Sequence, residues 1–401
     1  DTSRPEVDRR LWMQTSNLMA STAQKTLNGQ EKPTTVLRLD DFRESELDYP
    51  NTFADLVKAK QRPKPKPEIH QEEAISAVKD AFKDMDRGQL IMACGTGKTF
   101  TTLWIKEALA AQSTLVLLPS LSLLSQTMRE WAWAGNTGFA ILNVCSDKSV
   151  GRQSEDMSVN DAPFPVTSDP DEIASFLKKP SPKVVFCTYQ SSPLITDAQL
   201  KAADFTFDLA IADEAHRCAG KVDAGFATIL DGQKIRAAKR LFTTATPRYF
   251  GKSVVSKAEG RGLEVVGMND ELVFGPVVHQ LTFGEAIQRD LLTDYQVVVV
   301  GVNNSMVKSL IDERELLALS DKNHTDAESL AAKIGLIKAC KDYDLERVIS
   351  FHSRVRGAKE FAGEFIEIAN LIDPAQRPSG VFLTDYVSGD MNAGDRKNKI
   401  D

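Results

Sequence analysis

The stretch Met92-Ala93-Cys94-Gly95-Thr96-Gly97-Lys98-Thr99 decides the fold of this 401-residue chain. It follows a short apolar run at residues 89–93 and opens a helical pattern at residues 99–111, the context that distinguishes a phosphate-binding loop from a chance match. Gly95 and Gly97 lack a Cβ, so the backbone can curl and point its N–H groups at phosphate oxygens. The pattern departs from GxxxxGK[ST] because Met92 stands at the first glycine position.

The loop predicts a nucleotide site. Lys98 is expected to reach the β- and γ-phosphates, and the Thr99 hydroxyl to ligate Mg²⁺. The N-terminus of the following helix adds a favourable field for an anion. ATP and Mg²⁺ are therefore the expected cofactors. The predicted binding residues in the loop are Gly95, Thr96, Gly97, Lys98 and Thr99.

A second signal is the acidic pair Asp213-Glu214, which ends the apolar run that begins at Phe207. Such a pair suits the carboxyl edge of a parallel sheet, where ligands bind. We expect Asp213 to hold Mg²⁺ and Glu214 to polarise the attacking water as general base. The alternative is a pair that only caps the next helix. The phosphate-binding loop upstream favours the catalytic interpretation.

Strand and helix patterns alternate along most of the chain, which predicts an α/β fold with parallel sheets flanked by helices. The first series has strands at residues 113–118, 140–144, 183–188, 207–213 and 240–244. A second series, from about residue 280, has strands at residues 295–302, 347–351 and 381–386. The leader is expected to hold a helix at residues 11–27 and a strand at residues 34–39.

Composition excludes several classes of protein. Lys plus Arg is 49 and Asp plus Glu is 56, a net charge of −7, which argues against binding nucleic acid by bulk positive charge. No stretch approaches the roughly 20 apolar residues of a membrane span. The five cysteines form no close pair, which suits a reducing cytoplasm. A Lys/Pro run at residues 58–67 is interpreted as a solvated linker or as a basic strap on a phosphate backbone.

Asp213-Glu214-Ala215-His216 resembles motif II of the superfamily 2 helicases and translocases in its DEAH form. Further segments resemble other motifs of that family in the same order: residues 67–74, 117–126, 186–191, 243–247, 347–361 and 387–396. The resemblance implies tandem RecA-like domains with ATP between them, and DNA crossing both. The arginine-bearing motif VI is not found in this chain.

The resemblance also implies roles for individual residues. Gln71 would recognise adenine, and His216 would bond to motif III. Thr244 and Thr246 would couple hydrolysis to domain motion. Contacts to nucleic acid are implied for Pro119, Ser120, Thr188 and Ser353.

The strings Arg87-Gly88-Gln89-Leu90 and Leu118-Pro119-Ser120-Leu121 resemble the motor domains of type I and single-polypeptide type ISP restriction enzymes. We therefore predict a leader or linker at residues 1–66, possibly the tail of an upstream nuclease domain. A first RecA-like lobe is predicted at residues 67–280 and an incomplete second lobe at residues 281–401. No Glu-x-Lys occurs, so a complete PD-(D/E)xK nuclease site is not expected here. A chain that starts at Asp1, without Met, is interpreted as a piece of a larger protein.

The expected function is an ATP-dependent DNA translocase or helicase motor of a restriction-modification or related anti-phage enzyme. Duplex DNA is the expected track. Other domains or subunits would carry the nuclease, methyltransferase or target recognition. One alternative is a nucleotide-gated clamp or signalling ATPase that does not translocate. Another is an RNA helicase, which RNA and DNA would stimulate equally.

Overall fold

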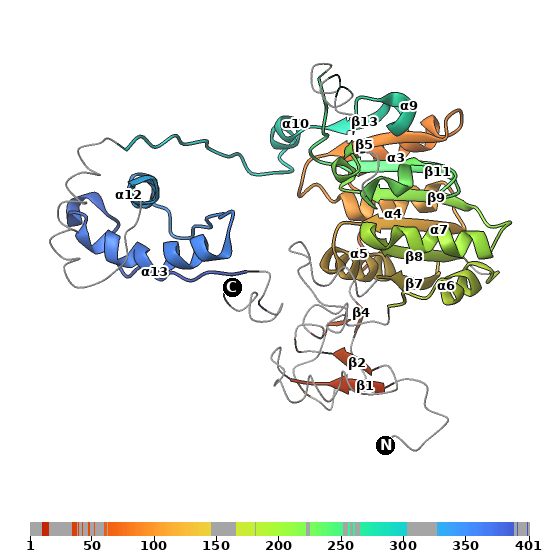
Figure 1. The fold of residues 1–401 in the computed structure, drawn as a ribbon, viewed down its shortest axis with the longest axis horizontal. Helices are drawn as coiled ribbons and strands as arrows, with labels where there is room; N and C mark the ends of the chain where they lie inside the picture. The colour runs from red at the N-terminus through yellow and green to blue at the C-terminus, as the bar shows by residue number, and fades with distance from the viewer. Residues whose placement is uncertain are drawn as a thin grey trace. The chain divides into compact units, whose positions relative to one another are not determined.

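A computed structural model divides the chain into two compact units, residues 1–294 and 295–401, which are described separately (Figure 1). The residues that the structure describes are 10–15, 34–37, 39, 42, 47–48, 52, 60–61, 63–145, 166–180, 182–221, 225–251, 256, 260, 265–302, 327–388, 391 and 399.

The first unit is built on a seven-stranded sheet whose paired strands are all parallel. Its spatial order is β13-β5-β11-β9-β6-β8-β7. The strands are β5 (Arg87–Met92), β6 (Ser113–Leu118), β7 (Ala140–Val144), β8 (Lys183–Thr188), β9 (Phe207–Asp213), β11 (Ala237–Thr244) and β13 (Val277–Leu281). The central strands are nearly continuous apolar runs because helices cover both faces of a parallel sheet. The predicted α/β fold is confirmed in this unit.

Helices cover the two faces of the sheet (Figure 1). One face packs against α3 (Ile69–Ala81), α4 (Lys98–Ala108) and α5 (Leu121–Ala134). The other packs against α6 (Pro170–Leu177) and α7 (Ser192–Lys201). Trp131 and Phe242 are fully buried, one in each of the two hydrophobic clusters. The sequence patterns did not predict α7 or β13.

The end of the first unit lies beyond the predicted boundary at residue 281. The helix α10 (Phe283–Gln288) buries Ala286 in the cluster beneath α3 and α4, and Leu291 and Leu292 pack against the same cluster. Arg289 pairs with Glu73 of α3 at 2.7 Å. These contacts place residues 281–294 with the first unit. Before them, α9 (Glu271–Phe274) precedes β13, and the short strands β10 (Gly220–Lys221) and β12 (Val265–Val266) pair antiparallel.

In the leader, the strand predicted at residues 34–39 is present as β2 (Thr34–Leu37), but the start of the predicted helix is not. A strand, β1 (Arg10–Met13), pairs in parallel with β2 (Thr34–Leu37), so the helix predicted to begin at Leu11 is wrong at its start. Pairing with a partner strand overrides local helix preference here. The rest of the predicted helix lies outside the described residues. Two further short strands, β3 (Leu47–Asp48) and β4 (Lys60–Gln61), pair antiparallel.

The second unit packs α12 (Ala327–Asp342) against α13 (Val355–Leu371) around Ile334, Ile337 and Ile368. The strands predicted at residues 295–302, 347–351 and 381–386 are wrong, since these described residues belong to no strand. Val302 and Phe382 pack against the cluster of this unit, but other apolar side chains of these segments are exposed, with Phe351 at 94% and Leu383 at 91%. A strand is stable only when neighbouring strands satisfy its backbone groups, and propensity alone does not supply them.

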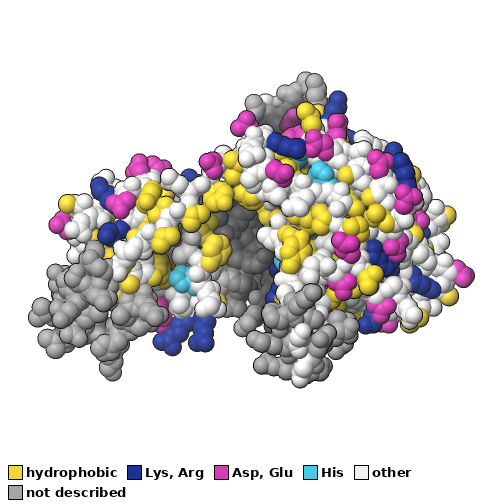
Figure 2. All heavy atoms as spheres, turned by 90° about the horizontal axis from the view of Figure 1, so that it is seen from above, with side chains coloured by type: hydrophobic (Ala, Val, Ile, Leu, Met, Phe, Trp, Pro, Cys, Tyr) yellow, Lys and Arg dark blue, Asp and Glu magenta, His cyan; other side chains and the backbone are white. Residues whose placement is uncertain are grey.

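No helix in the part of the chain that the structure describes is long and apolar enough to cross a membrane. On the first unit, at the right of Figure 2, basic and acidic side chains are interspersed rather than gathered by sign.

Candidate nucleotide site

Three neighbouring strands bring the predicted site residues to one edge of the first sheet. The central one, β11, pairs with β5 on one side and with β9 on the other. In this register Thr243 lies opposite Asp213, and Thr244 lies opposite Ile91, one residue before the end of β5. Because all three strands are parallel, the loops after them meet at the carboxyl edge, where α/β proteins bind ligands.

The loop between β5 and α4 has the backbone that phosphate binding requires. Gly95 and Gly97 adopt φ of +84° and +77°, a left-handed conformation that favours glycine. The Thr96 hydroxyl donates to the Ala93 carbonyl at 2.7 Å and closes the loop. The helix α4 begins at Lys98, so its first N–H groups face the loop. This geometry agrees with the predicted phosphate-binding loop.

The helix α3 holds the loop from the other side. His70 Nε2 lies 3.0 Å from the Thr96 carbonyl oxygen. Gln71 Nε2 donates to the carbonyls of Thr96 and Gly97 at 3.4 and 3.3 Å, while its Oε1 accepts from the backbone N–H of Glu68. The amide of Gln71 is thus engaged with the loop. Its recognition of adenine stays a prediction.

The acidic pair lies where β9 ends: Asp213 is the last residue of the strand, and Glu214 begins a strained turn. Glu214 has φ of +51°, which is uncommon for a residue with a side chain and costs energy at this position. Its carboxylate Oε1 lies 3.7 Å from Lys98 Nζ. Asp213 Oδ1 accepts a hydrogen bond from the Thr243 hydroxyl at 2.8 Å. The lysine and both carboxylates, predicted from separate segments, are therefore brought together.

A network joins the DEAH segment to the end of β11. His216 Nδ1 lies 2.9 Å from Thr244 Oγ1, so the contact predicted between these segments is present. The Thr244 hydroxyl donates to Glu214 Oε2 at 3.3 Å and accepts from the Thr246 backbone N–H at 3.2 Å. The hydroxyl proton is used by Glu214, so Nδ1 of His216 is the donor in its bond to Thr244.

Burial shifts two pKa values in this network. Burial raises the pKa of Asp213, and the neighbouring Glu214 carboxylate raises it further, against the lowering effects of Thr243 and Lys98. Burial lowers the pKa of His216, and the nearby Glu214 carboxylate opposes that shift. The lowered pKa keeps the His216 side chain neutral near pH 7. In this neutral form, one ring nitrogen donates a hydrogen bond and the other accepts one.

The donors at this edge suit a magnesium ion that is shared with a nucleotide. Among the described residues, no group of three or more His, Cys, Asp or Glu side chains is arranged to hold a metal. Thr99 and Asp213 supply only oxygen donors, and Mg²⁺ is commonly held by one or two such groups together with phosphate and water. The oxygen donors of Thr99 and Asp213 therefore fit a Mg²⁺ ion that binds together with the phosphates of a nucleotide.

The residues predicted to contact nucleic acid are differently placed. Pro119, Ser120 and Thr188 are buried, and the Ser120 hydroxyl accepts from the Leu123 N–H as the N-cap of α5. The Thr188 hydroxyl donates to Ser191 Oγ at 2.9 Å. Ser353 is exposed in the second unit. The predicted contacts at these positions stay predictions. In the separate segment at residues 387–396 that resembles a further family motif, Gly389, Asp390 and Arg396 lie outside the described residues.

Three side chains near the site were not assigned to it from sequence. Thr243 holds Asp213, as described above. Trp131 Nε1 donates to the Thr99 carbonyl at 3.0 Å, and the buried Tyr189 hydroxyl donates to the Asp213 carbonyl at 2.7 Å. From sequence alone, an aromatic residue among apolar neighbours is predicted to be a core residue. Only the three-dimensional structure shows which partner its N–H or O–H group binds.

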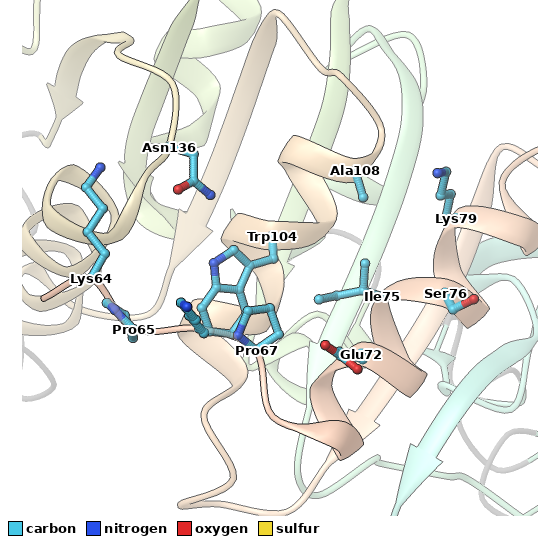
Figure 3. A pocket seen from close by; sticks show the side chains of 11 residues that line it. Lys64, Pro65, Pro67, Glu72, Ile75, Ser76, Lys79, Trp104, Ala108 and Asn136 are labelled. Carbon is cyan, nitrogen blue, oxygen red and sulfur yellow. The ribbon is translucent and has the colours of Figure 1, made fainter.

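A separate pocket of about 510 Å³ lies along α3 and α4, where the Lys/Pro run crosses them (Figure 3). Lys64, Lys66, Lys79 and Trp104 are among its lining residues, and Lys64 Nζ donates to the Gly135 carbonyl. No residue of the predicted nucleotide site lines this pocket. The end of the Lys/Pro run at residues 63–67 thus lies beside α3 and α4 within the first unit.

Comparisons with known proteins agree with this geometry. Residues 64–249 match the family described as type III restriction enzyme, res subunit. The chain resembles a superfamily 2 helicase. Residues 2–58 match a second family, described as restriction endonuclease.

The chain is also similar in sequence to curated proteins and to solved structures. "Probable helicase A859L" of African swine fever virus (isolate Tick/Malawi/Lil 20-1/1983) is 26% identical over 323 residues, which cover 79% of this chain and 33% of the viral protein. The same-named protein of strain Badajoz 1971 Vero-adapted is 29% identical over 233 residues, 58% of this chain and 24% of that protein. The chain therefore spans about a third or less of these relatives.

Two solved structures are of type ISP restriction enzymes. The ATP-dependent Type ISP restriction-modification enzyme LlaBIII bound to DNA is 27% identical, with a TM-score of 0.80, and covers 100% of this chain and 27% of its own. A nuclease-deletion mutant of the Type ISP enzyme LlaGI, in complex with a DNA substrate mimic, is 29% identical. Its TM-score is 0.54, and the match covers 76% of this chain and 21% of that one. Within the helicase superfamily, the likeness is to type ISP motor domains.

Proposed function

We propose that this chain is the ATP-driven motor region of a restriction enzyme and that it translocates along duplex DNA. The observation that carries the proposal is the convergence of Lys98, Glu214 and the His216–Thr244 pair at one sheet edge. The match of residues 64–249 to a restriction-enzyme subunit family, and the DNA-bound type ISP neighbours, support the choice of DNA.

In this proposal, Lys98 and the loop N–H groups bind and orient the ATP phosphates. Glu214 accepts a proton from the attacking water as general base, within the turn held by Thr244 and His216. Mg²⁺, when bound through Thr99 and Asp213, supplies charge neutralisation at the phosphates. Thr244 and Thr246 relay the state of Glu214 to the end of β11, which is the proposed coupling step.

The proposed partners follow from the relatives. Domains or subunits that carry nuclease, methyltransferase and target-recognition functions are expected beside this motor, and the match of residues 2–58 supports a nuclease connection. A cytoplasmic location belongs to the same proposal. The proposed lobes are residues 67–280 and 281–401, with the leader at residues 1–66, and residues 281–294 belong to the first compact unit.

Triplex displacement by the full-length protein tests translocation. A motor that tracks duplex DNA strips a third strand in an ATP-dependent way, and Lys98→Ala abolishes the release. A nucleotide-gated clamp hydrolyses ATP but leaves the third strand bound. Equal stimulation of hydrolysis by RNA and by DNA would instead favour an RNA helicase.

A further inference from the structure

A buried hydroxyl on β11 holds the first carboxylate of the acidic pair. Thr243 is fully buried, and the register of β11 with β9 places it opposite Asp213. Its hydroxyl donates to Asp213 Oδ1 at 2.8 Å. A hydroxyl buried away from water needs such a partner. The bond therefore joins two neighbouring strands at the sheet edge that carries the candidate nucleotide site.

The next residue of β11 holds the other carboxylate. The Thr244 hydroxyl donates to Glu214 Oε2 at 3.3 Å. Successive side chains of a strand point to opposite faces of the sheet, so the two threonines reach different partners. Thr243 contacts the carboxylate that is proposed to bind Mg²⁺, whereas Thr244 contacts the proposed general base. A change at Thr243 can therefore affect the metal site without removing this contact of Glu214.

The Asp213 residue is held at two points. Thr243 holds Oδ1 of its side chain, and the buried Tyr189 hydroxyl donates to its backbone carbonyl at 2.7 Å. With the backbone and one carboxylate oxygen held, rotation of the carboxylate is restricted, and Oδ2 is the oxygen that the threonine leaves to a ligand. Carboxylates that bind metals are commonly oriented by hydrogen bonds from residues that do not themselves touch the metal.

The orientation of a donor oxygen matters strongly for Mg²⁺. This ion demands near-ideal octahedral geometry and is usually held by one or two carboxylates together with phosphate and water. The site proposed for it has only two protein oxygen donors, from Thr99 and Asp213. With so few donors, a wrongly oriented Asp213 would remove a large part of the protein's share of metal binding.

We propose that Thr243 is a positioning residue that orients Asp213 for Mg²⁺ and so sets how tightly the metal binds together with the nucleotide. This inference rests on the proposed function, which assigns the metal to Thr99 and Asp213. Thr243→Val nearly keeps the shape of the side chain but removes the hydroxyl. The metal then binds less tightly, while Lys98 and the loop N–H groups still bind the phosphates.

The test is the Mg²⁺ requirement for nucleotide binding, measured on the full-length protein with a fluorescent, non-hydrolysable ATP analogue. Fluorescence anisotropy follows binding of the analogue as Mg²⁺ is added to a metal-free sample. Thr243→Val raises the Mg²⁺ concentration for half-maximal binding by about tenfold or more, the lower range for loss of a group that orients a metal ligand. Thr243→Ser keeps a hydroxyl and stays close to the wild type. A serine variant as impaired as Thr243→Val overturns the role of the hydroxyl.

A second buried threonine provides the matched control. Thr114 of β6 is fully buried, and its Oγ1 has no hydrogen-bond partner among the described residues. Thr114→Val makes the same chemical change without touching the acidic pair, and leaves the Mg²⁺ requirement unchanged. If Thr243→Val weakens binding by the same factor with and without Mg²⁺, the inference is overturned, because a general loss of structure does not depend on the metal.

Two further results separate this inference from the proposed function. If Mg²⁺ does not strengthen binding of the analogue to the wild type, the proposed metal site fails and the inference fails with it. If the wild type needs Mg²⁺ and Thr243→Val has the same requirement, the inference alone is wrong. Should Thr243→Val not fold, Thr243→Cys decides, because a thiol is only a weak donor. The Mg²⁺ requirement of that variant must rise, and an unchanged requirement overturns the inference.

Discussion

Similar apolar sequence patterns have different structures in the two units of this chain. In the first unit, apolar runs such as Phe207–Asp213 lie inside a parallel sheet, and their polar ends carry the site. In the second unit, the apolar runs at residues 347–351 and 381–386 belong to no strand and expose Phe351 and Leu383. The difference shows that a β-pattern becomes a strand only where partners accept its backbone, and that site geometry depends on those partners.

The largest effect expected from this comparison is on stability. Phe242→Ala removes a fully buried ring that packs edge-on against Phe274 of the first unit, and should cost about 3–5 kcal/mol in the free energy of unfolding. Phe351→Ala removes a ring that is 94% exposed and should change stability by less than about 0.5 kcal/mol.

Urea unfolding measures the first change, because all four tryptophans (Trp12, Trp104, Trp131 and Trp133) lie in the first unit. Amide hydrogen exchange in α12 and α13 measures the second. A comparable loss at Phe351 would show that this residue is buried in the folded protein, and the contrast between the units would fall.

A smaller effect on stability is expected at Asp213, whose carboxylate is proposed to bind Mg²⁺ but is costly to bury at the sheet edge. The pKa of Asp213 is raised in the folded state, so the native protein holds a proton where the unfolded chain has released it. Stability must therefore fall as pH rises from the ordinary range of an aspartate through this raised value. Asp213→Asn keeps the oxygen that accepts from Thr243 but carries no charge. It should stabilise the first unit by about 1 kcal/mol at pH 7, with the gain shrinking toward acid pH.

Thermal unfolding followed by tryptophan fluorescence at several pH values measures this gain. Asp204→Asn, at an exposed position, is the matched control, since surface substitutions usually change stability by less than about 0.5 kcal/mol. An Asp213→Asn variant that is less stable than the wild type at pH 7 would mean that the carboxylate is favourably paired instead of costly to bury.

Much of the first unit could be predicted from sequence because local patterns and tertiary environment agree there. The strands β6, β7, β8 and β9 begin and end at the predicted residues, since each is a short apolar run bounded by polar or turn residues. The edge strand β13 was missed because His279 and Gln280 interrupt its apolar pattern. The helix α7 was missed because it opens with Ser192-Pro193, which reads as a turn, although proline is well tolerated in a first helical turn.

Some residues of the candidate site could be predicted from sequence and others could not. Lys98, Glu214 and His216 were predicted because their residue types and spacing carry the chemistry, and the sheet register then brought them together. The support from Tyr189 could not be predicted, because a hydrogen bond to a backbone carbonyl 24 residues away leaves no pattern in the sequence. In the second unit the predicted strands failed, because their partners are a tertiary property that the pattern does not contain.

The central claim is that the carboxyl edge of the first sheet is an ATPase site that duplex DNA stimulates. Steady-state ATP hydrolysis by the full-length protein at saturating duplex DNA tests it most directly, with Glu214→Gln compared against the wild type. Glu172→Gln, in the exposed first turn of α6, is the matched control. The expected result is a loss of about 100-fold or more for Glu214→Gln, the contribution of a general base, with the control unchanged. A Glu214→Gln rate within about threefold of the wild type, far below a general base's usual effect, would contradict the claim.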